Sequence, residues 1–262
     1  MHQTRFDRYD NLFPFTVMDP EDTEMSQEWL CQGLIMRKKI NVLFGAEKAG
    51  KSRLMAWVLA HLYARREVFG KEGRHPGKTL YLAGEETRQE VTGRLVAFQD
   101  SAGIPPEEID WAGSVEFCEA AGMRLDHKVQ REWLAQKLRT GAYQTLIVDP
   151  LRRVHGASES SNDEMAPICN DLRDWTNRYG ITMLLIHHTG KLSLDDDESR
   201  IATWSRGATD LPAVLDWAMY AKRIEAKGQD RIILRRKGRA PKENTLVILD
   251  GGDVFRLGAE VD

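Results

Sequence analysis

The sequence predicts an α/β fold in which helices flank a mainly parallel sheet, with antiparallel strands at the C-terminal end. Two observations predict this fold. From Trp29 onward, short apolar runs alternate with segments whose apolar residues recur at helical spacing. A glycine-rich loop, residues 45–52, lies between the first apolar run and the first such segment. The length of 262 residues suits one α/β domain with modest additions.

Five apolar runs are short enough to be buried strands. They cover residues 39–44, 79–83, 115–118, 145–148 and 181–186. Four intervening segments carry apolar side chains on one face, as Leu54, Val58 and Leu62 do in the first. These predicted helices cover residues 52–66, 88–100, 128–139 and 163–179. From Trp217 we expect short strands joined by turns, at residues 231–236, 245–249 and 254–257.

The first 28 residues differ in composition from the rest. They contain prolines and an acidic run, which disfavour a packed element. Phe13, Phe15 and Val17 alternate, so they can place one face of a short strand on another surface. That surface is either the chain's own domain or a neighbouring subunit. We therefore divide the chain into an N-terminal arm, residues 1–28, which is a candidate for oligomer contacts, and one α/β domain, residues 29–262.

The charge, the cysteine content and the distribution of apolar residues limit which classes of protein the chain can belong to. With 37 basic and 40 acidic residues, the net charge is −3, so a nucleic-acid contact would need a local basic patch. The three cysteines have no paired spacing, which favours a reduced compartment and gives no zinc signature. No apolar stretch approaches the roughly 18 residues of a membrane span, and the N-terminus has no apolar targeting segment. We expect a cytoplasmic protein with no membrane contact.

The glycine-rich loop fits the pattern G-x-x-x-x-G-K-[ST], which wraps the phosphates of a nucleoside triphosphate. Its glycines let backbone N–H groups point at anionic oxygens, and the next helix points its N-terminus at the same anion. We expect Lys51 to contact the β- and γ-phosphates of ATP and the Ser52 hydroxyl to ligate Mg²⁺. The alternative is a chance glycine turn between a strand and a helix. The predicted nucleotide-binding residues are Gly45, Ala46, Glu47, Lys48, Ala49, Gly50, Lys51 and Ser52.

A single carboxylate, Asp149, closes the fourth predicted strand. Open parallel sheets bind ligands at the carboxyl ends of their strands. We therefore expect Asp149 to hold Mg²⁺ together with Ser52. The alternative is an aspartate that only caps the strand end.

Two carboxylates, Glu85 and Glu86, follow the second predicted strand. One of them is expected to take a proton from the water that attacks the γ-phosphate. That role requires a separate strand beside the phosphate loop, and the second strand is predicted to supply it. The alternative is a glutamate that caps the helix at Arg88, an interpretation that suits Glu86 better than Glu85.

A histidine pair, His187 and His188, ends the fifth predicted strand. A polar side chain there can donate a hydrogen bond to the γ-phosphate. Zinc is not expected, because no Asp or Glu accompanies the pair at ligand spacing. The alternative for one of the two is a histidine buried in the core.

Several stretches in the same order resemble the RepA-like ATPases of the RecA superfamily. The resembling stretches are 29–35 (WLCQGLI), 44–52 (FGAEKAGKS), 81–85 (YLAGE), 148–156 (VDPLRRVHG), 185–191 (LIHHTGK) and 206–208 (RGA). The resemblance implies a RecA-like three-layer P-loop ATPase core. It also implies a homo-oligomer, a hexameric ring with each ATP at a subunit boundary. The family includes replicative helicases of plasmids and many phage-encoded proteins.

The resemblance assigns roles to individual residues. It makes Lys51 and Ser52 ligands of phosphate and Mg²⁺, Asp149 the Walker B carboxylate, Glu85 the catalytic base, and His188, ahead of His187, the γ-phosphate sensor. Arg94, on the helix after Glu85, belongs to the same pattern. Lys48 inside the loop is a further match to these sequences.

A ring-shaped ATPase needs a cation from the neighbouring subunit, an arginine finger, at each ATP. Arg206 is the first choice for this role. Lys237 and Arg239 are the rivals, because they resemble the K-x-R found between late strands of RecA-type ring motors. The alternative for each is a solvated basic residue.

Two loops indicate whether ATP hydrolysis is coupled to movement along DNA. Arg152 and Arg153, after the fourth strand, are suited to the phosphates of single-stranded DNA. The loop after the fifth strand instead has four consecutive acids, residues 195–198, which would repel DNA. The leading hypothesis is a helicase that translocates on single-stranded DNA in plasmid or phage replication. The alternatives are a filament-forming recombination or mediator ATPase and a slowly hydrolysing, nucleotide-gated loader.

Overall fold

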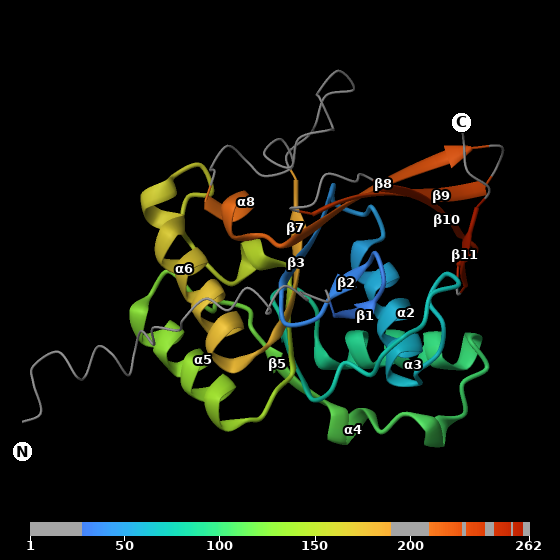
Figure 1. Cartoon of the computed structure of the whole chain (residues 1–262), viewed down its shortest axis with the longest axis horizontal. Coiled ribbons are helices and arrows are strands. Elements are labelled where there is room, and N and C mark those ends of the chain that lie inside the picture. Colours follow the sequence, from blue (N-terminus) through green and yellow to red (C-terminus); the bar gives the residue numbers. More distant parts are fainter. Residues whose placement is uncertain (1–27, 190–209, 227–228, 239–243, 253, 259–262) are drawn as a thin grey trace, which may run out of the picture.

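The computed structural model describes residues 28–189, 210–226, 229–238, 244–252 and 254–258 (Figure 1). Its centre is a nine-stranded sheet with the strand order β11-β10-β9-β8-β3-β7-β6-β4-β5. The parallel strands are β3 (Ile40–Gly45), β4 (Thr79–Ala83), β5 (Val115–Glu119), β6 (Thr145–Asp149), β7 (Thr182–His188) and β8 (Trp217–Ala226). The antiparallel strands are β9 (Gln229–Gly238), β10 (Asn244–Asp250) and β11 (Phe255–Leu257). The predicted fold class is confirmed.

Helices cover both faces of the sheet, which makes three layers (Figure 1). On one face lie α2 (Lys51–Tyr63) and α3 (Arg88–Ser101), which pack against each other. On the other lie α5 (Lys128–Thr140), α6 (Asn162–Tyr179) and the short α8 (Asp210–Val214). A four-residue helix, α4 (Trp111–Ser114), precedes β5.

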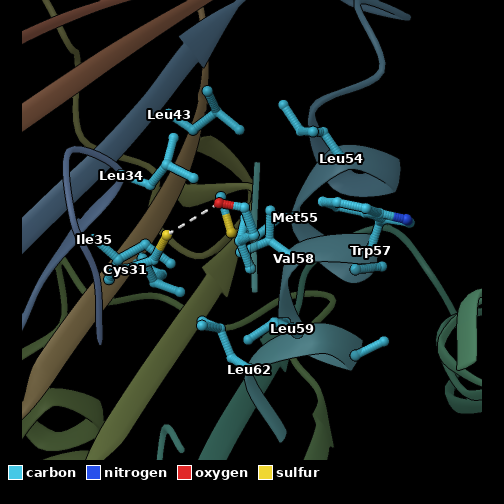
Figure 2. Close-up of a cluster of buried hydrophobic side chains, with 14 of the residues drawn as sticks. Cys31, Leu34, Ile35, Leu43, Leu54, Met55, Trp57, Val58, Leu59 and Leu62 are labelled. Carbon is cyan, nitrogen blue, oxygen red and sulfur yellow. Dashed lines mark hydrogen bonds between the residues drawn. The ribbon is translucent and has the colours of Figure 1, made fainter. Parts of the chain in front are cut away.

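Strand β3 shows how the sheet separates two cores. Its side chains alternate between the faces, so Leu43 packs with the α2 side whereas Val42 and Phe44 pack with the α6 side. Figure 2 shows Leu43 opposite Leu54 of α2 and near Leu34. Burial on both faces explains why this strand is apolar from Ile40 to Phe44 apart from Asn41, whose buried side chain is hydrogen-bonded to backbone groups.

The structure also differs from the predicted elements. Helix α2 ends at Tyr63 rather than at residue 66, because Arg65 has the left-handed φ of 54° that stops a helix. The C-terminal strands are not all short, since β8 and β9 have 10 residues each. A small two-stranded sheet, β1 (Trp29–Cys31) and β2 (Ile35–Met36), was not predicted. The predicted strand around Phe13 lies outside the described residues.

The strand order corrects one functional expectation. Strand β4, which leads to Glu85, was predicted to lie beside the strand of the phosphate loop. In the sheet β3 pairs with β7 and β8, and both β7 and β6 separate it from β4. Glu85 therefore meets the phosphate loop through side chains and loops at the carboxyl edge of the sheet, and not through strand pairing. Within the described residues, no helix combines the length and apolarity needed to cross a membrane.

Candidate active site

The loop of residues 45–52 connects β3 to α2 in the predicted order. Gly50, the N-cap of α2, has a left-handed φ of 82°, a conformation natural to glycine. At Gly45, a Cβ atom would lie 2.5 Å from the carbonyl oxygen of Ala221 on β8. Only glycine lets these two backbones approach so closely. Lys48 also has a positive φ, of 60°, although it carries a side chain.

The ammonium group of Lys51 is buried and makes three contacts. It donates to the carbonyl oxygens of Gly45 (2.9 Å) and Ala46 (2.7 Å), and it lies 3.2 Å from Nδ1 of His188. Burial lowers the pKa of Lys51 to about 8. Burial and the nearby Lys51 also lower the pKa of His188, so its imidazole is neutral at pH 7. Since Lys51 is a donor, Nδ1 of His188 accepts and the proton resides on Nε2.

Asp149 lies at the end of β6 between two hydroxyl groups. The Ser52 hydroxyl donates to Oδ1 (3.2 Å) and the Tyr81 hydroxyl to Oδ2 (2.9 Å). Burial raises the pKa of Asp149 to about 6, although both hydrogen bonds oppose this rise. One hydroxyl and one carboxylate are oxygen ligands of the kind Mg²⁺ takes when phosphates and water complete its shell. The structure thus brings together the two predicted Mg²⁺ ligands.

Glu85 faces an open cleft of about 760 Å³ beside the phosphate loop. Its Oε1 accepts from Nε of Arg153 at 2.6 Å, and its Oε2 lies 4.0 Å from Nε2 of His188. His188 therefore stands between Lys51 and Glu85 and contacts both. The cleft is lined by Glu47, Lys48, Gly84, Glu85, Ala121, Gly122, Arg153 and His188.

Glu86 has a different role from the helix cap considered for it. Its carboxylate pairs with Arg94 of α3, with Nη1 at 2.9 Å from Oε2. Helix α3 is capped by Thr87 and Glu90, whose side chains and backbone N–H groups bond reciprocally. The capping interpretation of Glu86 is therefore wrong.

Residues 8–193 match the family model described as AAA domain. The chain belongs to the AAA domain family. It is accordingly a P-loop ATPase, an enzyme that binds and hydrolyses a nucleoside triphosphate, and the site described above lies within the matched region. No curated protein matches the chain.

Most of the candidate arginine-finger residues of this AAA domain protein lie outside the described residues. Arg206 and Arg239 are outside the described residues, as is the acidic stretch 195–198. The backbone of Lys237 is in β9 and pairs with Ala218, which in turn pairs with Val42. Val42 precedes Gly45 by three residues on β3, so Lys237 is set back from the phosphate loop of its own chain.

His187 is the core histidine that the sequence allowed for one of the pair. It is 1% exposed, and its ring meets Phe44 edge-on at 5.5 Å. His188, the next residue, points to the opposite side of β7 and reaches the cleft. The alternation along the strand thus separates the two predicted sensors into a buried residue and a residue of the site.

Sequence reasoning missed the part that Tyr81 and Asp250 play. Tyr81 was placed in a predicted strand and in a stretch that resembles the RepA-like ATPases, and nothing in the periodicity indicates that its hydroxyl reaches Asp149. The buried carboxylate of Asp250 pairs with Arg53 of α2 (3.0 Å) and with Arg223 of β8 (3.2 Å). This cluster ties the C-terminal strands to the helix that follows the phosphate loop. The sequence contains no local signal for a pairing between residues so far apart.

Proposed function

We propose that the chain is a Mg²⁺-dependent ring-forming ATPase that translocates on single-stranded DNA, as a helicase of plasmid or phage replication. The observation that carries the hydrolytic part is the line of contacts from Lys51 through His188 to Glu85. His188, a neutral donor, and the carboxylate of Glu85 line one cleft, and Lys51, the candidate phosphate ligand, contacts His188.

The two carboxylates of the site lie in different environments, which suits them to different roles. Asp149 is buried and hydrogen-bonded by Ser52, so these two residues would hold Mg²⁺, which would neutralise charge on the β- and γ-phosphates. Glu85 is 41% exposed at its side chain and faces the open cleft, where water has access.

Hydrolysis then follows from what each residue donates or accepts. When ATP binds, the ammonium group of Lys51 gives up a hydrogen bond to a backbone carbonyl and donates to phosphate oxygens instead. The Nε2–H of His188 donates to the γ-phosphate. Glu85 takes a proton from water, whose oxygen forms a bond to the γ-phosphorus. The bond from that phosphorus to the bridging oxygen breaks, and ADP leaves with the electron pair.

The ring and the DNA substrate rest on the resemblance to RepA-like ATPases and on two features of the cleft. It is open, so a neighbouring subunit's cation, Arg206 or the pair Lys237 and Arg239, has room to reach the γ-phosphate. Arg153, which is suited to DNA phosphates, lines the same cleft.

An ATPase assay with and without oligo(dT), on protein sized by light scattering, tests this function. Wild-type protein should hydrolyse ATP faster with oligo(dT) and have the mass of a ring. Lys51→Ala should abolish hydrolysis, and Glu85→Gln should bind ATP without turnover. Normal turnover by Glu85→Gln would refute the assignment of the base. A filament in electron micrographs would favour the recombination ATPase, and slow hydrolysis indifferent to DNA would favour the loader.

A further inference from the structure

The candidate base is held by a residue of the loop that follows β6. Nε of Arg153 donates to Oε1 of Glu85 at 2.6 Å, a short distance typical of a charge-assisted hydrogen bond. Gly84 makes this contact possible, because a Cβ atom there would lie 2.5 Å from Cβ of Arg153. The backbone of Arg153 is therefore packed against the end of β4, which brings its side chain to Glu85.

The loop that carries Arg153 is anchored by buried side chains. Leu151 and Val154 flank the arginine and are fully buried. Further along, the carboxylate of Glu159 lies near His155 (3.6 Å) and His187 (3.8 Å), two buried side chains. These buried contacts anchor the backbone on both sides of Arg153, whereas its side chain is exposed and can change partner.

The pair itself is exposed. The side chain of Arg153 is 61% exposed and that of Glu85 is 41% exposed. Exposed ion pairs contribute little net free energy, so another anion can compete for the guanidinium. The planar guanidinium fits phosphate as well as it fits carboxylate. A backbone phosphate of single-stranded DNA that enters the open cleft therefore has the chemistry to take Arg153 from Glu85.

We propose that Arg153 is a positioning residue that restrains Glu85, and that a phosphate of single-stranded DNA releases the base by binding Arg153. This inference rests on the proposed function, since it assumes that Glu85 takes the proton from the attacking water. A guanidinium bound at Oε1 occupies a lone pair that would otherwise accept the proton of the attacking water. Release leaves Glu85 to receive the proton while water bonds to the γ-phosphorus and ADP departs.

The test compares ATP turnover of wild type, Arg153→Ala and Arg178→Ala with and without oligo(dT). Arg178 is the matched control, because it is also an exposed arginine in an ion pair, with Asp174 at 3.0 Å. It lies near the end of α6 that leads into the start of β7, at the edge of the sheet away from the cleft. Loss of an exposed pair should raise the DNA-free kcat of Arg153→Ala by about 1.4- to 5-fold, with KM for ATP unchanged. The stimulation by oligo(dT) should fall by the same factor.

The outcomes separate this inference from the proposed function. A DNA-free kcat of Arg153→Ala equal to or below that of wild type, or undiminished stimulation by oligo(dT), overturns the restraint while leaving the ATPase assignment intact. The double variant Arg153→Ala, Glu85→Gln should remain inactive with and without DNA. Turnover by that double variant would instead refute Glu85 as the base, and with it both proposals. Thermal melting of each variant checks that the fold is retained.

Discussion

Removing the hydroxyl of Tyr81 should make the use of Mg²⁺ dependent on pH. This hydroxyl donates to Oδ2 of Asp149 at 2.9 Å, and the acceptor is buried. Burial, helped by the nearby Glu86, raises the pKa of Asp149 to about 6, while the two hydrogen bonds and Arg94 oppose the rise. Tyr81→Phe removes one of the two hydrogen bonds that stabilise the ionised form, with little change in shape.

The size of the effect follows from the energy of that hydrogen bond. A bond to a charged group contributes about 1.5–3 kcal/mol, and one pKa unit corresponds to about 1.4 kcal/mol. The pKa of Asp149 should therefore rise by about 1–2 units, to about 7–8. Since Mg²⁺ binds the ionised carboxylate, the Mg²⁺ concentration for half-maximal rate should increase about 2- to 10-fold at pH ~7. The increase should disappear by pH ~9, where both proteins are ionised at Asp149.

The assay is ATP turnover against Mg²⁺ concentration at several pH values, for wild type, Tyr81→Phe and Tyr63→Phe. Tyr63 is the control because its buried hydroxyl donates to neutral acceptors, Thr79 Oγ1 and the Gly77 carbonyl. Its loss should lower the free energy of unfolding by about 1 kcal/mol without a pH-dependent change in Mg²⁺ requirement. A Tyr81→Phe defect of equal size at every pH, or no defect at pH ~7, would refute the reasoning.

Three further predictions concern the phosphate loop and the subunit boundary. Gly45→Ala should lower the free energy of unfolding by about 1–3 kcal/mol, because the new Cβ would lie 2.5 Å from a β8 carbonyl; an unchanged melting temperature would contradict this. The dissociation constant of ATP should increase as pH rises above the Lys51 pKa of about 8, since the ammonium is lost, and Lys51→Arg should lack this dependence. Arg206→Ala should be inactive alone yet partly recover turnover when mixed with Glu85→Gln; absence of recovery would favour Lys237 or Arg239 as the finger.

The individual elements were largely predictable because their signals are local. Strand β4 has the predicted limits, residues 79–83, and α3 differs by one residue. Buried strands and amphipathic helices follow from residue types a few positions apart. By contrast, the pairing of Gly45 with Ala221 connects residues far apart in the chain, and the left-handed Arg65 that ends α2 has no composition signal.

The phosphate loop could be predicted from the sequence because its functional residues are consecutive or nearly consecutive in the chain. Lys51 and Ser52 stand at fixed spacing from the loop glycines, and Asp149 ends an apolar run at a strand terminus. These local facts were enough to select Lys51, Ser52 and Asp149 as the candidate ligands of phosphate and Mg²⁺. They also identified Glu85 as a candidate, although it was expected on a strand adjacent to the loop.

Only the tertiary structure decided how these groups meet. The order of strands places β7 and β6 between the phosphate loop and Glu85, so His188, at the end of β7, forms the connection, and Arg153, after β6, contacts Glu85. Likewise, Tyr81 reaches Asp149 because β4 pairs with β6 in one register. Sequence periodicity specifies which face of a strand is buried, whereas strand order and register depend on burial summed over the whole sheet. The local sequence therefore determined which residue types form this ATPase site, whereas the packing of segments far apart in the chain determined which side chains contact one another.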